Sequence, residues 1–395
     1  MLQLSKYGLR RAAVGMVALF ALSSAAQAVD GDDAAARLRT LFGEQGGSIE
    51  YTAVQTNGST VVIRDAKISI DDESRVIGTS DITLNDVSGD ERDGFKIGDL
   101  TLPKLEIEID ARTHHRMVLI GLRFERITLP PKEAAGPFAK ILQWEKLTIR
   151  QISSRIESQE IYVADNLSFA GSAMSATSPG KYSFNVDSLK LNLGSVASPI
   201  GPALKDLGYE TITGKIAVSG GWDLANGHIT IDKAELIADD VATLSLALDA
   251  TGYTLDVFEA LEHADAINAT EVERRAIMDR RVMPRLKLAA AFIRFDDNSL
   301  TNKVLDYIAR QQGGGRSDVI NQAKATLLAM VATSISDTDF IKSLTEALDT
   351  YLNDPRSIEL RLGPEKPTSL SFIRLGMIVP NTLIKTLRIR ARANE

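Results

Sequence analysis

Residues 216–231 read Ile-Ala-Val-Ser-Gly-Gly-Trp-Asp-Leu-Ala-Asn-Gly-His-Ile-Thr-Ile, and this stretch decides the fold. Two runs with alternating apolar and polar residues flank Asn226-Gly227. Alternation with period two is the signature of a strand with one buried face, and Asn-Gly supplies the positive φ angles of a tight turn. The stretch therefore predicts an antiparallel β-hairpin.

The same period-two pattern extends in both directions, from Ser48 to about Ala250. A second Asn-Gly pair, Asn57-Gly58, lies between two of the short runs and predicts another hairpin. No long helical pattern separates the runs, so sequential strands are expected to pair with their neighbours rather than to form parallel βαβ units. The predicted fold is α+β and mainly β, with a long antiparallel meander sheet that is curved or groove-like and a C-terminal helical cluster.

The pattern changes near Tyr253. Helical spacing covers 254–283, a strand or strand pair runs through 286–295, and three helices are expected at about 299–312, 317–333 and 337–353. Ser317 and Asp337 are the predicted N-caps, and Gly313-Gly314-Gly315 is predicted to end the first of the three helices. The tail predicts a strand at 358–362, short helices within 369–386 and a last strand at 387–392. The expected organisation is a meander over 29–252 and a helix-rich region over 253–395 whose returning strands pack on the same sheet.

The first 28 residues have the order of an export signal. Basic residues (Lys6, Arg10, Arg11) precede an apolar run over 12–22, and small residues end at Ala26-Gln27-Ala28. This order predicts a cleavable signal peptide over 1–28 and a mature chain starting near Val29, whereas a buried N-terminal helix is the alternative. The expected location is the periplasm, with no transmembrane anchor in the mature chain.

Composition excludes several classes of function. The chain carries 45 basic and 52 acidic residues, a net charge of -7, and no cysteine. Nucleic acid binding is not expected, because it needs a basic patch, and the only candidate is the cluster Lys385, Arg388, Arg390 and Arg392. Its alternation with apolar residues favours a strand with one solvated cationic face. The absence of cysteine removes thiol catalysis and thiolate metal sites.

No motif predicts chemistry. The four histidines are His114, His115, His228 and His263, and they lack metal-ligand spacing or an evident carboxylate partner. Gln312-Gly313-Gly314-Gly315-Arg316 lacks the Gly-Lys-Ser/Thr of a phosphate loop and favours a helix–helix turn. The pairs Asp71-Asp72, Asp239-Asp240 and Asp296-Asp297 have the positions of turn aspartates at strand ends. The prediction is therefore a protein that is not an enzyme, with no catalytic, cofactor-binding or metal site and no cofactor.

Three stretches carry a family resemblance: Gly-Leu-Arg-Phe-Glu-Arg-Ile-Thr-Leu-Pro at 121–130, Ile-Arg-Phe-Asp-Asp-Asn-Ser-Leu at 293–300, and Ala-Arg-Gln-Gln-Gly at 309–313. Together with the signal peptide, they look similar to uncharacterised secreted proteins of alphaproteobacteria. More distantly, the strand-rich body resembles the AsmA-like and YdgA-like envelope proteins. That resemblance implies a long curved sheet with an apolar groove, and it carries over no catalytic residues. The cleavable signal differs from the membrane anchor of the AsmA pattern.

Two hypotheses follow. In the first, one sheet face lines a groove for an acyl chain or another amphiphile, so that this is an exported lipid-binding envelope protein. In the second, the inward faces fill one another and the protein is an envelope scaffold or protein-interaction module, which would bind its partner at a sheet edge or at the helical end. Apolar residues on both strand faces would discriminate them, and the sequence shows such stretches at 117–120 and 234–238.

Overall fold

A computed structural model describes residues 29–44, 47–69, 75–76, 80–136, 138, 141–173, 175–195, 200–264 and 270–395. The predicted signal peptide and the pair Asp71-Asp72 lie outside these residues. The described chain is mainly β, with one long, open, antiparallel sheet and helices gathered in the C-terminal region, which confirms the predicted fold class.

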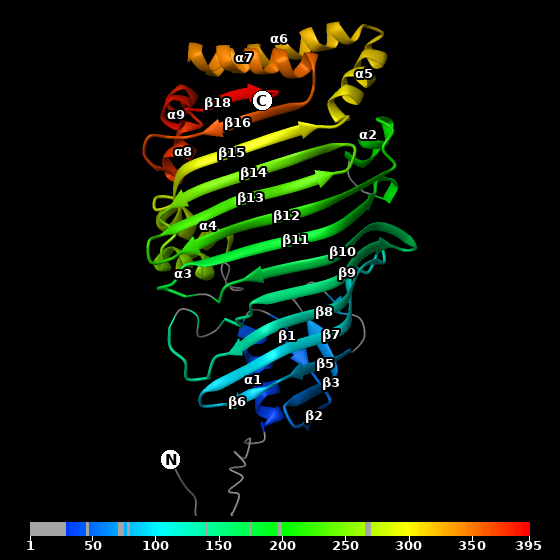
Figure 1. Ribbon diagram of the computed structural model, residues 1–395, viewed down its shortest axis with the longest axis vertical. Coiled ribbons are helices and arrows are strands. Elements are labelled where there is room, and N and C mark those ends of the chain that lie inside the picture. Colours follow the sequence, from blue (N-terminus) through cyan, green and yellow to red (C-terminus); the bar gives the residue numbers. More distant parts are fainter. Residues whose placement is uncertain are drawn as a thin grey trace, which may run out of the picture.

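The sheet grows strand by strand along the chain (Figure 1). Its N-terminal strands are β1 (Ser48–Glu50), β2 (Ala53–Asn57), β3 (Thr60–Ser69), β4 (Arg75–Val76), β5 (Ser80–Asn85), β6 (Ser88–Asp90), β7 (Gly94–Asp110) and β8 (His115–Leu129). The middle strands are β9 (Lys146–Ile156), β10 (Gln159–Gly171), β11 (Gly180–Asn192), β12 (Thr211–Asp223), β13 (His228–Ala238) and β14 (Ala242–Thr251). The C-terminal strands are β15 (Lys287–Asp297), β16 (Ser357–Leu362), β17 (Thr368–Ser369) and β18 (Arg390–Ala393).

Pairing is antiparallel throughout, and from β7 to β16 each long strand pairs with the next long strand along the chain. Both predicted hairpins are present: β2 and β3 join at Asn57-Gly58, and β12 and β13 join through Asn226-Gly227. Gly58 and Gly227 have φ angles of 60° and 66°, the positive values that these turns require. Sheet growth therefore follows local turn chemistry.

Helices cover both ends of the sheet. The C-terminal helices are α5 (Leu300–Gln312), α6 (Arg316–Ser334) and α7 (Thr338–Asn353), and Figure 1 shows α6 and α7 lying beyond the edge strand β18. The structure also contains α2 (Ile200–Asp206), α3 (Leu255–Ala264), α4 (Glu271–Ile277), the π-helix η2 (Met278–Val282), α8 (Leu370–Gly376) and α9 (Pro380–Leu387). A helix along an edge strand protects its unpaired backbone groups from pairing with another chain.

The helix α1 (Gly31–Glu44) was not anticipated from the sequence and fills the N-terminal end of the sheet. Asp30 Oδ1 accepts hydrogen bonds from the amides of Asp32 and Asp33, 3.0 and 3.2 Å away, so it caps the helix. Leu38 and Leu41 are buried in the largest apolar cluster of the described chain, together with side chains of β3, β5, β7 and β8. Arg37 donates from Nε to the Pro130 carbonyl, 2.6 Å away. These contacts place α1 firmly on one face of the sheet.

Two boundary predictions are wrong. Ser317 is not an N-cap: α6 begins at Arg316, and the Asp318 carboxylate accepts a hydrogen bond from the Gly315 amide. The last strand begins at Arg390 rather than at residue 387, because α9 continues to Leu387 and Arg388 then adopts a left-handed conformation, with φ of 50°. By contrast, Asp337 is confirmed as the N-cap of α7 and accepts from the Phe340 amide.

A single row of irregular positions crosses five adjacent strands. The cross-strand pairs skip Pro103, Gly121, Arg150, Asn166 and Asp187 without a change of register from β7 to β11, and the register shifts at this row only between β11 and β12. Gly121 and Asn166 have φ angles of 68° and 52°. On either side of the row, the residues that face the core are three positions apart rather than two. Leu119 and Leu122 of β8 are an example. A β-bulge bends a strand and increases its twist, and the register shift between β11 and β12 is an irregularity of this kind.

We expect Gly121→Val to lower the free energy of unfolding by about 2 kcal/mol, because a β-branched residue is strained at positive φ. A Cβ at Gly121 would also lie 3.1 Å from the Arg150 Cβ. Gly363→Val is the matched control, since a Cβ there meets no atom within 4 Å. Urea unfolding measures both variants. Equal stability of the two variants would contradict a strained position at Gly121.

Candidate functional site

One face of the sheet presents an uninterrupted ladder of apolar side chains. Cross-strand pairing places one residue of each successive long strand in a first row. In order, these residues are Val61, Leu84, Leu100, Phe124, Leu147, Phe169, Phe184, Val218, Ala234, Leu246, Ile293, Leu360 and Ala391. With neighbouring strands about 4.8 Å apart, the row is about 58 Å long.

A second row runs beside the first, two residues along each strand. It comprises Leu102, Leu122, Ile149, Leu167, Val186, Ile216, Leu236, Leu244, Phe295, Ile358 and Ala393. Side chains two apart on a strand share a face, so both rows lie on the same side of the sheet. Neither row contains a polar side chain. We call this surface the apolar face.

Burial of the apolar face decreases from the N-terminal to the C-terminal end. Val61 and Leu84, which pack in the same cluster as α1, are completely buried. In the middle, the Trp144 ring lies 5.4 Å from that of Phe124 and 5.0 Å from that of Phe169, in edge-to-face geometry. Toward the other end, five large side chains on β13 to β16 are 36% to 46% exposed: Leu236, Leu244, Leu246, Ile293 and Leu360. These five residues form the open patch.

The opposite face of the same strands is polar. One row on it, again aligned by cross-strand pairing, comprises Thr83, Thr101, Arg123, Thr148, Ser168, Asn185, Ala217, Glu235, Ser245, Arg294, Glu359 and Arg392. An antiparallel sheet commonly turns one face to water and the other to a core. In this protein, the side chains of the apolar face remain apolar from β13 to β16, where they are only partly covered.

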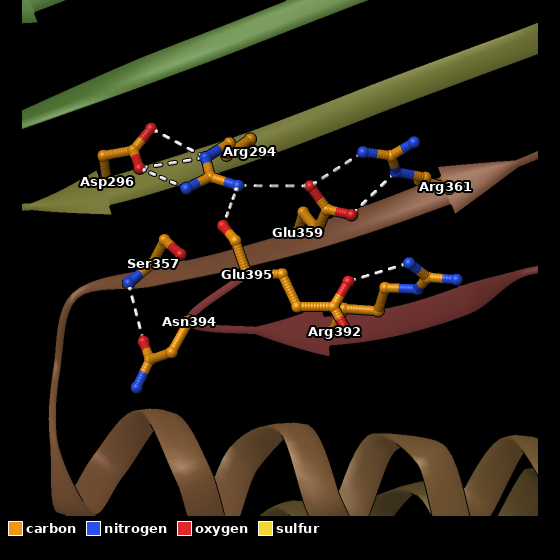
Figure 2. Close-up of polar contacts among 8 residues, drawn as sticks. All are labelled: Arg294, Asp296, Ser357, Glu359, Arg361, Arg392, Asn394 and Glu395. Carbon is orange, nitrogen blue, oxygen red and sulfur yellow. Dashed lines mark hydrogen bonds and ion pairs between the residues drawn. The ribbon is translucent and has the colours of Figure 1, made fainter.

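An ion-pair network stabilises the polar face at its C-terminal edge (Figure 2). Glu359 is 3% exposed and accepts from Arg361 Nε at 2.7 Å and from Arg294 Nη1 at 3.4 Å. Arg294 also donates to Asp296, 2.9 Å away, and to the carbonyl of Glu395. Because these residues belong to β15, β16 and the chain end, the network joins the last strands to the sheet.

Burial raises the pKa of the Glu359 carboxyl, but hydrogen bonds and charges from Arg361 and Arg294 outweigh it and hold that pKa below its usual range. A carboxyl with a lowered folded-state pKa adds stability above the usual pKa and loses it as the pH falls through the folded value. Glu359→Gln should therefore cost about 1.5 to 3 kcal/mol near neutral pH and flatten the loss of stability below about pH 4. Unfolding free energies measured across the acid range test this. The prediction would be contradicted if the wild type and Glu359→Gln lost unfolding free energy equally as the pH falls.

The histidines do not form one site. His114 lies in a turn with φ of 50°, and His115 begins β8, so the two do not share a strand. His115 Nε2 lies 2.8 Å from Ser154 Oγ. His228 does have a carboxylate partner, Asp249, 2.8 Å away. Asp249 pairs with Thr230, two residues along β13 from His228, so the two side chains meet diagonally on one face of the sheet. Over the described ranges, no group of three His, Cys, Asp or Glu residues could hold a metal ion.

The other motifs have structural roles. Gly313 ends α5 in a left-handed conformation, and the triple glycine joins α5 to α6 as a helix–helix turn. Asp239-Asp240 lies in the turn between β13 and β14, and Asp297 at the end of β15 accepts from the Thr301 amide of α5, 2.8 Å away. In β18, Arg390 and Arg392 are exposed while Ala391 is buried, which confirms the strand with a cationic face for these two residues. Lys385 and Arg388 do not belong to the strand, because they lie in α9 and at its C-cap.

The fold and this surface define an open-sheet β protein whose most distinctive surface is an apolar face. A family model described as "Uncharacterized protein" matches residues 235–394, from β13 to the end of β18. This range contains all five residues of the open patch. No curated protein matches the chain. No helix in the described part of the chain is both long and apolar enough to cross a membrane.

Proposed function

We propose that this protein is an exported, non-enzymatic protein of the cell envelope that binds the acyl chain of a lipid along its apolar face. The observation that carries the proposal is the open patch: five large apolar side chains on four adjacent strands that remain more than one-third exposed. Contiguous exposed apolar surface of this kind marks a binding site in soluble proteins.

The chemistry of the apolar face favours an acyl chain as the occupant. Strands β13, β14 and β15 have strand partners on both sides, so their backbone groups are already hydrogen-bonded. Neither row of the apolar face offers a polar side chain. A ligand without hydrogen-bonding groups loses nothing on such a surface, whereas a peptide would need partners for its own backbone.

The shape of the apolar face also supports this occupant. The two rows lie about 7 Å apart along the strands, while the ladder continues across many strands. This gives a strip that is long and narrow, as a hydrocarbon chain is. The predicted export signal over 1–28 and the resemblance to AsmA-like and YdgA-like envelope proteins agree with a periplasmic lipid-handling role.

The test uses the full chain purified without detergent. Solvent extraction followed by mass spectrometry should recover lipid, and a fluorescent fatty-acid probe should gain emission on binding to delipidated protein. Recovery of empty protein together with no gain in probe fluorescence would exclude the lipid proposal. In that case, the scaffold alternative predicts a stable complex in which an envelope protein covers the open patch.

A further inference from the structure

A second apolar surface lies away from the sheet, in the turn between α8 and α9. Four of the five residues from 375 to 379 carry large apolar side chains that are 55% to 79% exposed: Leu375, Met377, Ile378 and Val379. We call this segment the tip. Single exposed apolar residues are ordinary, but four together are not. No other five-residue stretch within the described ranges exposes as many.

The tip is a firmly held turn. Gly376 is buried, and a Cβ there would lie 3.0 Å from Leu383, so α8 and α9 pack closely at this point. Ile384 and Leu387 anchor α9 in the protein interior. On the α8 side, the Ser371 amide donates to the Met283 carbonyl, 3.1 Å away. Such anchoring presents the apolar side chains in a defined orientation.

The amides of the tip are hydrogen-bonded within the turn. The amides of Met377, Ile378 and Val379 donate to the carbonyls of Ile373, Leu375 and Gly376, at 3.0 to 3.1 Å. In an apolar medium, every unsatisfied backbone group is costly. A turn with satisfied amides and outward apolar side chains can therefore enter such a medium intact.

Basic residues lie on the elements that carry the tip and on the strand next to them. A pocket of about 750 Å³ beside α8 and α9 is lined by Lys287, Lys366, Lys385 and Arg388, with Phe372 in its wall. The one acidic residue of its lining, Glu365, already pairs with Arg388. On the neighbouring segment, Asp279 pairs with Arg374.

The charge of this region opposes that of the whole chain. Segments 271–289 and 364–388, which meet at the contacts of α8, together contain ten basic and four acidic residues, 10 minus 4 or +6. The full sequence carries 45 minus 52, or -7. Positive charge is thus concentrated beside the tip in an otherwise acidic protein.

We call Lys287, Lys366, Lys385 and Arg388 the basic rim. We propose that the tip and the basic rim dock the protein onto an anionic lipid bilayer. The apolar side chains of the tip would enter the headgroup and acyl boundary, and the lysines and arginines of the rim would contact lipid phosphates. Apolar insertion combined with basic attraction is the established physical basis of interfacial membrane binding. This surface is separate from the apolar face, and the inference goes beyond the proposed lipid binding without depending on it.

Vesicle co-sedimentation of the full chain tests the proposal. We expect the protein to bind vesicles of phosphatidylcholine with roughly 30% phosphatidylglycerol, and to bind pure phosphatidylcholine vesicles about ten-fold more weakly. Binding to the anionic vesicles should be lost at about 0.5 M salt. The double variant Met377→Ser/Ile378→Ser should weaken anionic binding about ten-fold. Lys366→Glu/Lys385→Glu should do the same and also reduce the salt dependence.

The matched control is Leu327→Ser/Met330→Ser, which removes two exposed apolar side chains of α6. It should bind vesicles as the wild type does, and the unfolding midpoint of each variant shows whether it is folded. Absence of vesicle binding, equal binding to neutral and anionic vesicles, or equal loss in the α6 control would overturn the proposal. The fatty-acid probe, titrated against the tip variant, should bind unchanged, which separates this outcome from failure of the proposed function.

Discussion

Replacing Leu41 by alanine is expected to lower the free energy of unfolding by about 3 to 5 kcal/mol. Leu41 lies on α1, is completely buried and belongs to the largest apolar cluster of the described chain. Truncation removes the transfer free energy of its side chain and leaves a cavity between helix and sheet. The expected cost is near the upper end for a leucine, because the surrounding strands are held in register by cross-strand pairing and cannot collapse easily.

Urea unfolding followed by tryptophan fluorescence measures this effect, since Trp144 packs against the same cluster. Leu327→Ala is the matched control: it makes the same change in a helix, but at a side chain that is 38% exposed. That control should cost about 1 kcal/mol or less. If both variants lost the same stability, α1 would not be the structural end piece that its packing indicates.

Placing two carboxylates on the open patch, with Leu246→Asp/Ile293→Asp, is expected to weaken fatty-acid probe binding about 100-fold, or about 2.8 kcal/mol. Leu246 and Ile293 are paired across β14 and β15 at the centre of the patch. A bound acyl chain would desolvate the new carboxylates without pairing them, which is costly. Because both positions are more than one-third exposed in the free protein, its folding should change little.

Ser245→Asp is the control for this experiment, since residue 245 lies between Leu244 and Leu246 on the opposite face of β14 and adds the same kind of charge there. Its probe affinity should equal that of the wild type. Titration of both variants with the same probe gives the comparison. Equal weakening by the two variants would show that charge alone matters and would remove the apolar face as the binding surface.

The structure confirms much of what the sequence pattern predicts, for identifiable reasons. Hairpins at Asn57-Gly58 and Asn226-Gly227 follow from local turn chemistry, and the C-cap at Gly313 follows from the conformational freedom of glycine. The cap of α1 by Asp30 had a local signal as well, namely an aspartate followed by acidic residues and by Ala34, Leu38 and Leu41 at helical spacing.

The exact register of the paired strands could not be predicted from the sequence. The partnership of His228 with Asp249 depends on the register of β13 against β14, which is a property of two strands. Glu359 also has a partner that only strand pairing supplies. It accepts hydrogen bonds from Arg361 on its own strand and from Arg294 on β15. The division into a meander over 29–252 and a helix-rich region over 253–395 remains a prediction. Strands β15, β16 and β18 of the second region lie in the same sheet as the meander.

The sequence by itself determined that this protein is an antiparallel meander with one apolar and one polar side, because a period of two assigns each residue to a face from its neighbours alone. Only the tertiary structure decided which part of the apolar side is covered. Coverage depends on where α1 packs, which depends on contacts between distant segments. For the same reason, the tip between α8 and α9 became recognisable as an exposed surface only once the chain was folded.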